Sequence, residues 1–131
     1  MAYRLILLLS LVSISAKLCA QNELLDMEAP EALENIKLVK LSTSAEASSF
    51  VIWVKDTVRP HYHAEHTENL YVLDGKGIMY LDSNRYELKP GDFYTIPKKS
   101  VHSVKVHSKI PLKVLSIQAP EFFGKDRIFV E

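Results

Sequence analysis

The sequence predicts a single all-β domain, and three observations lead to this prediction. Short runs rich in β-branched and aromatic residues follow one another from residue 36 onward. Turn residues separate these runs, and no segment after residue 47 has helical spacing. The 131 residues, 47% of them hydrophobic and 24% charged, suffice for one domain with an ordinary core. Many short strands at regular spacing are typical of a β-sandwich or barrel.

The expected strands lie between segments whose residues favour turns, such as Asp-Gly-Lys-Gly at residues 74–77 and Lys-Pro-Gly-Asp at residues 89–92. The strands are residues 36–41, 50–54, 70–73, 78–81, 93–96, 101–106 and 112–117. We expect three parts in the mature chain: an N-terminal arm and edge strand at residues 21–47, a barrel at residues 48–118, and a C-terminal tail at residues 119–131 that packs on the barrel.

The charge balance excludes several classes of partner. Lys and Arg number 16, as do Asp and Glu, so the formal charge is zero. A general nucleic-acid binder needs a basic excess to neutralise phosphates, so no nucleic-acid partner is expected. The four glycines form no phosphate-binding loop.

Residues 1–20 have the pattern of a secretory signal peptide. Arg4 supplies a positive charge, residues 5–14 are almost continuously apolar, and cleavage is expected after Ala20. The apolar run is too short to span a bilayer, so no stable membrane insertion is expected once the signal is removed. We therefore expect an exported protein, periplasmic or secreted. The less favoured alternatives are a buried N-terminal helix and a lipoprotein anchored through Cys19.

Removal of the signal has two consequences for the mature chain. Cys19 is the only cysteine, so the mature protein would have neither a disulfide nor a cysteine nucleophile. Loss of Arg4 and Lys17 leaves 14 basic against 16 acidic residues, a net charge of −2. The remaining domain is small, and its edge strand at residues 36–41 needs covering or pairing, so we expect a homodimer.

Three of the five histidines lie within six residues, at His61, His63 and His66. Alternate residues of a strand point to one face, so His61 and His63 can present both imidazoles to one point. Pro60 suits the start of this strand. After a short turn, Glu68 can reach the same point from the neighbouring antiparallel strand. Imidazole and carboxylate together suit iron, manganese, nickel, copper or zinc.

Two spaced motifs resemble those of the cupin superfamily over roughly residues 48–118. The first contains two histidines, a glutamate and a glycine, and the second a glycine, a proline and a histidine. In this sequence these residues are His61, His63, Glu68, Gly75, Gly91, Pro97 and His102. The resemblance implies a double-stranded β-helix, the jelly-roll cupin barrel. It also implies that His61, His63, Glu68 and His102 ligate one divalent metal ion.

Three positions depart from the family's motifs. Lys55 and Lys99 stand where the motifs have glycine, and Val106 stands where the second motif has asparagine. None is a ligand position, so we expect altered loop geometry and not a lost metal. His66 is expected at the rim or on the surface, and His107 in solvent.

The lining of the barrel follows from strand alternation. If Glu68 points inward, Leu70 and Val72 also point inward and Tyr71 points outward. Val104 joins the inward set by the same argument, because it lies two residues after a ligand position. These neighbours predict a largely apolar cavity floor.

The resemblance implies two classes of function. Cupins with this ligand set include dioxygenases, isomerases, decarboxylases and lyases, alongside members with no known catalysis. The first hypothesis is an exported metal-dependent enzyme, of the oxygenase, isomerase or lyase type, acting on a small oxygenated molecule. The alternative is a non-catalytic module that binds a metal or a small molecule such as a sugar. A purely structural β-domain is a third hypothesis.

Overall fold

A computed structural model describes residues 23–130 as a sandwich of two antiparallel β-sheets. The expected signal peptide, with Cys19, lies outside the described residues. One helical turn, α1 (Glu23–Asp26), precedes the strands. The strands are β1 (Ile36–Thr43), β2 (Ser48–Val54), β3 (Thr57–Tyr62), β4 (Thr67–Asp74), β5 (Gly77–Leu81), β6 (Asn84–Leu88), β7 (Phe93–Ile96), β8 (His102–Val106), β9 (Leu112–Ala119) and β10 (Ile128–Phe129). Within the described residues, no helix has the length and apolar character needed to cross a membrane.

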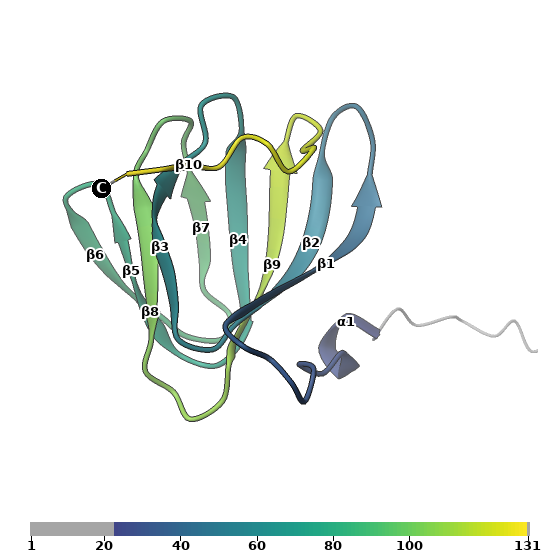
Figure 1. Ribbon diagram of the computed structural model, residues 1–131, viewed down its shortest axis with the longest axis vertical. Coiled ribbons are helices and arrows are strands. Elements are labelled where there is room, and N and C mark those ends of the chain that lie inside the picture. Colours follow the sequence, from purple (N-terminus) through teal and green to yellow (C-terminus); the bar gives the residue numbers. More distant parts are fainter. Residues whose placement is uncertain (1–22, 131) are drawn as a thin grey trace, which may run out of the picture.

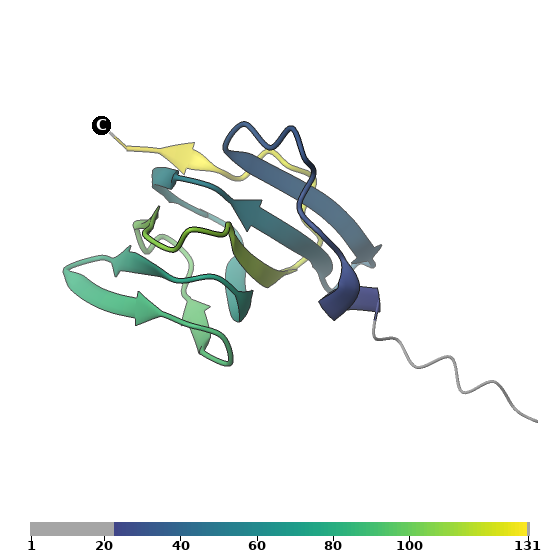
Figure 2. The ribbon, with the colours of Figure 1, turned by 90° about the horizontal axis from the view of Figure 1, so that it is seen from below.

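The two sheets each have five strands, and several successive strands alternate between them. One sheet has the order β1-β2-β9-β4-β7 and the other the order β10-β3-β8-β5-β6. In Figure 1 the C-terminal segment leaves β9, crosses the upper end of the sandwich and reaches β3. In Figure 2 β10 lies beside β3, and the β5–β6 hairpin forms the opposite margin of that sheet. This arrangement is the jelly roll that the sequence predicts.

The hydrophobic core fills the space between the sheets. Alternate residues of β2 and β9, in the middle of their sheet, point apolar side chains into this space, and β4 adds two more. The buried residues of the core are Phe50, Ile52, Val54, Leu70, Val72, Met79, Leu88, Ile96, Val104, Leu112, Val114 and Phe122. Because polar side chains enter this core at one end only, that end holds the candidate site.

The N-terminal arm packs outside the sandwich and is anchored by a buried lysine. Lys113 on β9 donates hydrogen bonds from Nζ to the carbonyl oxygens of Leu25 and Met27, at 2.9 and 2.6 Å. Its ammonium lies 5.9 Å from the ring centroid of Trp53. The arm therefore covers the outer face of β2 and β9.

β3 carries His61, and the position of Pro60 in this strand differs from the prediction. The strand begins at Thr57, so Pro60 lies within it and not at its start. Pairing with β8 is irregular between Val58 and His61, and this break tolerates a residue that has no backbone N–H. The Pro60 carbonyl still accepts a hydrogen bond from the nitrogen of Val130, at 3.1 Å.

Candidate metal centre

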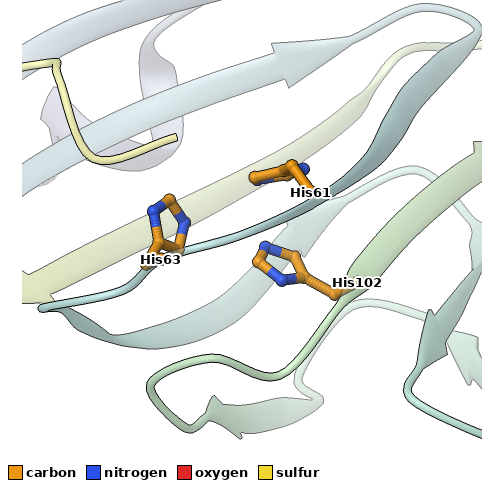
Figure 3. Close-up of side chains that lie close together, drawn as sticks. All are labelled: His61, His63 and His102. Carbon is orange, nitrogen blue, oxygen red and sulfur yellow. The ribbon is translucent and has the colours of Figure 1, made fainter. Parts of the chain in front are cut away.

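Three histidines converge at the end of the sandwich crossed by the C-terminal segment (Figure 3). His61 lies on β3 and pairs in register with His102, the first residue of β8. His63 follows the end of β3, in the connection to β4. All three are at least 96% buried, and one ring nitrogen of each lies within 4.8 Å of the others.

Each of these imidazoles is oriented by a backbone carbonyl. Nδ1 of His61 lies 2.8 Å from the oxygen of Arg59, and Nδ1 of His102 lies 3.1 Å from the oxygen of Ser100. Nδ1 of His63 hydrogen-bonds to the carbonyl oxygen of Asp126. Since a carbonyl only accepts hydrogen bonds, each Nδ1 carries the proton. The lone pair of each ring is then on Nε2, as is usual in histidines that bind metals.

Glu68 reaches this cluster from the opposite sheet. We expected it on the strand beside His61, and this was wrong, because β4 pairs with β7 and β9 and not with β3. Its Oε2 lies 3.4 Å from Nε2 of His63 and 3.4 Å from Nε2 of His102. Its Oε1 accepts hydrogen bonds from the side chains of Ser116 and Gln118 on β9. Glu68 is thus brought beside His63 and His102 across the sandwich, and the three histidines lie close to one another.

The electrostatics of the cluster favour a charged Glu68 carboxylate and a neutral His61. Burial raises the pKa of Glu68, but its close polar contacts with His102 and His63 and the hydrogen bond from Ser116 outweigh burial and hold that pKa well below its usual range. Burial, with the neighbouring His102, lowers the pKa of His61 to about 4. Burial also lowers the pKa of His63, but its interaction with Glu68 outweighs this effect and raises it. At neutral pH His61 is therefore an uncharged donor.

The donor atoms fit a divalent metal ion. Nε2 of His63 is buried and has no hydrogen-bond partner among the described residues. Ligand atoms about 2.1 Å from a metal lie roughly 3.0 to 3.4 Å apart when adjacent, which agrees with the separations around Glu68 Oε2. Three imidazole nitrogens and one carboxylate oxygen suit iron, manganese, zinc, nickel or copper. The assignment of these four residues as ligands stays a prediction.

An apolar cavity of about 180 Å³ opens at the histidines. Leu70, Val72 and Val104 line it as strand alternation predicts, and Tyr71 lies on the outer face with 41% exposure. The cavity walls therefore keep bulk water away from the ring nitrogens.

The C-terminal segment is the part of the site that sequence reasoning missed. Arg127 and Phe129 line the cavity, and the Phe129 ring lies 5.9 Å from that of His61. The Asp126 carboxylate accepts hydrogen bonds from the backbone nitrogens of Ala64 and Glu65, at 2.9 and 2.8 Å. We expected only that this tail packs on the barrel. No local signal links it to residues some 60 positions earlier.

His66 also differs from the expectation that it lies at the rim or on the surface. It is 7% exposed, and Nδ1 lies 2.5 Å from a carboxylate oxygen of Asp126. Nε2 lies 2.9 Å from the carbonyl oxygen of Glu121. His66 therefore fastens the C-terminal segment beside the site. His107 is exposed, as expected.

Two motif positions show how the loops near the site are built. Gly75 has φ +76°, and a Cβ there would lie 2.5 Å from the carbonyl oxygen of Pro111, so this position requires glycine. Lys99, which replaces a motif glycine, keeps a glycine-like φ of 67°. Its nitrogen donates to the His63 carbonyl at 2.6 Å. The departure at Lys99 therefore leaves the left-handed turn in place.

Comparisons with known proteins agree with this architecture. The family model described as "Cupin domain" matches residues 49–118. An uncharacterized protein of Aquifex aeolicus is 39% identical over 100 residues, covering 76% of this chain and 82% of the relative. Quercetin 2,3-dioxygenase of Bacillus subtilis is 31% identical over 125 residues, covering 83% of this chain but 37% of the dioxygenase.

Solved structures show the same fold. A double-stranded β-helix protein from Klebsiella pneumoniae superimposes with a TM-score of 0.68 at 16% identity, covering 82% of this chain and 94% of that one. The DMSP lyase of Ruegeria pomeroyi gives a TM-score of 0.65 at 14% identity, covering 79% and 55%. Together, the two facing sheets and the match of the cupin-domain model over residues 49–118 show that the chain belongs to the cupin family.

Proposed function

We propose that this chain is a metal-dependent cupin enzyme that acts on a small oxygenated molecule. His61, His63, Glu68 and His102 hold one divalent metal ion. The observation that carries the proposal is the set of three buried imidazoles, each oriented through Nδ1 by a backbone carbonyl and each left with an Nε2 that makes no hydrogen bond within the described residues. Three histidines with a purely structural role would not be expected to converge in this way, because their unprotonated ring nitrogens would be buried without hydrogen-bond partners.

The surroundings of the ligands favour catalysis over storage of the ion. Four protein ligands leave about two positions open in an octahedral shell. When bound, the ion would supply Lewis acidity or the activation of dioxygen. The apolar walls formed by Leu70, Val72 and Val104 exclude water, and Glu68 keeps its charge at neutral pH. Reactions of the dioxygenase, isomerase or lyase type are compatible with this centre.

The size of the cavity limits the substrate. Its volume of about 180 Å³ is below the range of about 300–1,000 Å³ that drug-sized ligands occupy. Bacillus subtilis quercetin 2,3-dioxygenase supports the oxygenase type, but this chain spans only 37% of it. The proposed substrate is therefore a small molecule whose oxygen atom reaches the metal.

Export and dimerisation belong to the proposal as well. The pattern of residues 1–20 supports export to the periplasm or beyond. β1 lies at the open margin of its sheet and exposes Ile36 and Leu41, which supports a homodimer through this edge. Light scattering at micromolar concentration should give the dimer mass, and a monomer mass would contradict it.

Elemental analysis tests the metal centre directly. The mature protein, purified without chelator, is compared with His61→Ala, His102→Ala and the exposed-histidine control His107→Ala. We expect about one equivalent of metal in the wild type and in His107→Ala, and almost none in the two site variants. Stoichiometric metal in both site variants would refute the ligand assignment.

Turnover separates the enzyme from a binding module. The metal-loaded protein is incubated with small hydroxy acids, enediols and diketones, with and without dioxygen, and the products are followed by mass spectrometry. Product formation that disappears in His61→Ala supports the enzyme. Saturable binding without any product over prolonged incubation would favour a non-catalytic module instead.

A further inference from the structure

Two arginines give the metal cavity a positive charge that no acid among the described residues pairs with. Arg59 and Arg127 both line the cavity, and among the described lining residues Glu68 is the only acid. Glu68 is already engaged by two histidines, Ser116 and Gln118. No ion pair of either guanidinium occurs within residues 23–130. The charge therefore faces the cavity without a partner of opposite sign.

Arg127 is held in place by its neighbours on both sides. Before it, Asp126 binds His63 through its carbonyl and residues 64–66 through its carboxylate. After it, Ile128 pairs with Tyr62, and Phe129 pairs with His61 in β10. The backbone of Arg127 is thus fixed against the first histidines, beside the cavity that its side chain lines.

The half-buried Arg127 side chain has a buried nitrogen without a hydrogen bond within residues 23–130. Its Nε is buried and has no partner among the described residues. Removing a donor of a charged group from water without a partner is costly, so a ligand that accepts its hydrogen bonds would be strongly favoured.

Arg59 lies at the mouth of the same cavity and plays a different part. Its guanidinium carbon lies 4.9 Å from the ring centroid of Phe129, and the residue is exposed. A guanidinium stacked on an aromatic ring in contact with solvent contributes attraction at long range. It therefore guides an anion towards the cavity, whereas the half-buried Arg127 can bind one.

We propose that Arg127 binds the anionic group of the substrate, which is a small organic carboxylate held between the metal centre and the Arg127 guanidinium. A guanidinium pairs with a carboxylate through two parallel hydrogen bonds, which also fix the direction of the bound molecule. The apolar walls strengthen this pairing because they lower the local dielectric constant. This inference rests on the proposed function and adds the substrate class to it.

The test uses two probes that differ only at one end. Succinate has two carboxylates, so that one can reach the metal and the other Arg127. Succinamate keeps one carboxylate and replaces the other by a neutral amide of similar shape. Both are titrated by calorimetry into the full mature protein reconstituted with Mn²⁺. The wild type should bind succinate at least about tenfold more tightly than succinamate.

Three variants show whether Arg127 causes this preference. Arg127→Gln should bind Mn²⁺ normally and lose the preference for succinate over succinamate. Arg127→Lys should keep part of this preference, because an ammonium retains the charge but cannot form the two parallel hydrogen bonds of a guanidinium. Arg85→Gln is the matched control, since Arg85 is exposed and paired with Glu87 away from the cavity, and it should behave as the wild type does. Circular dichroism and Mn²⁺ content show that each variant is folded and loaded.

The outcomes separate this inference from the function on which it rests. A Mn²⁺-loaded wild type with no preference for succinate, or a preference unchanged in Arg127→Gln, overturns the role of Arg127 and leaves the metal centre intact. A folded wild type that retains no Mn²⁺ after reconstitution overturns the metal centre, and the substrate class falls with it.

Discussion

Ser116 donates a hydrogen bond to Oε1 of Glu68 and thereby turns Oε2 towards the histidines. Ser116 is fully buried on β9, opposite Leu70, so the bond runs diagonally between neighbouring strands. A hydroxyl from the neighbouring strand therefore decides which carboxylate oxygen is available at the metal centre.

Ser116→Ala should weaken metal binding without removing a ligand. Glu68 would keep only the longer hydrogen bond from Gln118 and would rotate more freely. Loss of such a supporting bond typically costs about 10- to 100-fold in metal affinity. A competition titration with a chromogenic chelator measures the change. Ser103→Ala, on the outer face of β8, is the control, and equal affinity in the two variants would contradict the role of Ser116.

Asp126→Ala should destabilise the protein and loosen His63. The variant loses acceptors for the nitrogens of Ala64 and Glu65 and for His66. Hydrogen bonds to a charged acceptor are worth about 1.5–3 kcal/mol each, and they are not additive, so we expect a loss of about 2–4 kcal/mol. Urea unfolding of the metal-free protein measures it. A midpoint unchanged from the wild type would show that the Asp126 carboxylate contributes nothing to stability.

Lys99→Gly should make the protein more stable. The left-handed φ of 67° costs a residue with a Cβ about 1 kcal/mol or more, and glycine avoids this cost while adding backbone entropy to the unfolded chain. We expect a net gain of about 0.5 kcal/mol or a little more. The control is Lys98→Gly, which is not in a left-handed conformation and should be less stable than the wild type. Thermal unfolding that ranks the two variants the other way round would contradict the backbone argument.

The metal-free protein should lose stability in mildly acidic solution. Because the pKa of His61 is about 4 in the folded state and 6.5 in the unfolded state, the unfolded chain takes up a proton first as the pH falls. The stability present above about pH 6.5 is therefore lost progressively towards pH 4, by about 2–3 kcal/mol from this group. His63, whose pKa is raised, acts in the opposite direction only while the pH falls towards about 6.5, and its contribution no longer changes below that pH.

Urea unfolding in the presence of EDTA, repeated between about pH 7 and pH 4, measures this loss. His61→Gln should flatten the dependence, because glutamine does not titrate. The same slope in the variant as in the wild type would show that another group dominates.

Most of the barrel could be predicted from local patterns. The strand at residues 93–96 has the bounds that alternation and the flanking turns indicate, and the other expected strands lie within the observed ones to within a few residues. β6 was missed although Tyr86 and Leu88 alternate with the exposed Arg85 and Glu87, because this strand is short and follows directly on the turn residues at positions 82–84.

The candidate site could be predicted only in part, for a physical reason. The ligand positions follow from spacing within two short motifs, and the structure brings those side chains together. The groups that orient them are backbone carbonyls and distant residues such as Asp126, which leave no pattern near the histidines. Contacts between segments separated by some 60 residues depend on tertiary packing, and local sequence does not encode them.

The attachment of the C-terminal segment to His63 sets the order of events when the protein is made. The histidines of β3 are synthesised early, but the carbonyl that orients His63 and the strand that pairs with His61 belong to residues 126–129. The metal centre is therefore incomplete on a nascent chain and is finished only when these last contacts close. Loading of the ion would follow folding, in the compartment where folding is completed. An exported chain would then acquire its metal outside the cytoplasm and not in the compartment where it is synthesised.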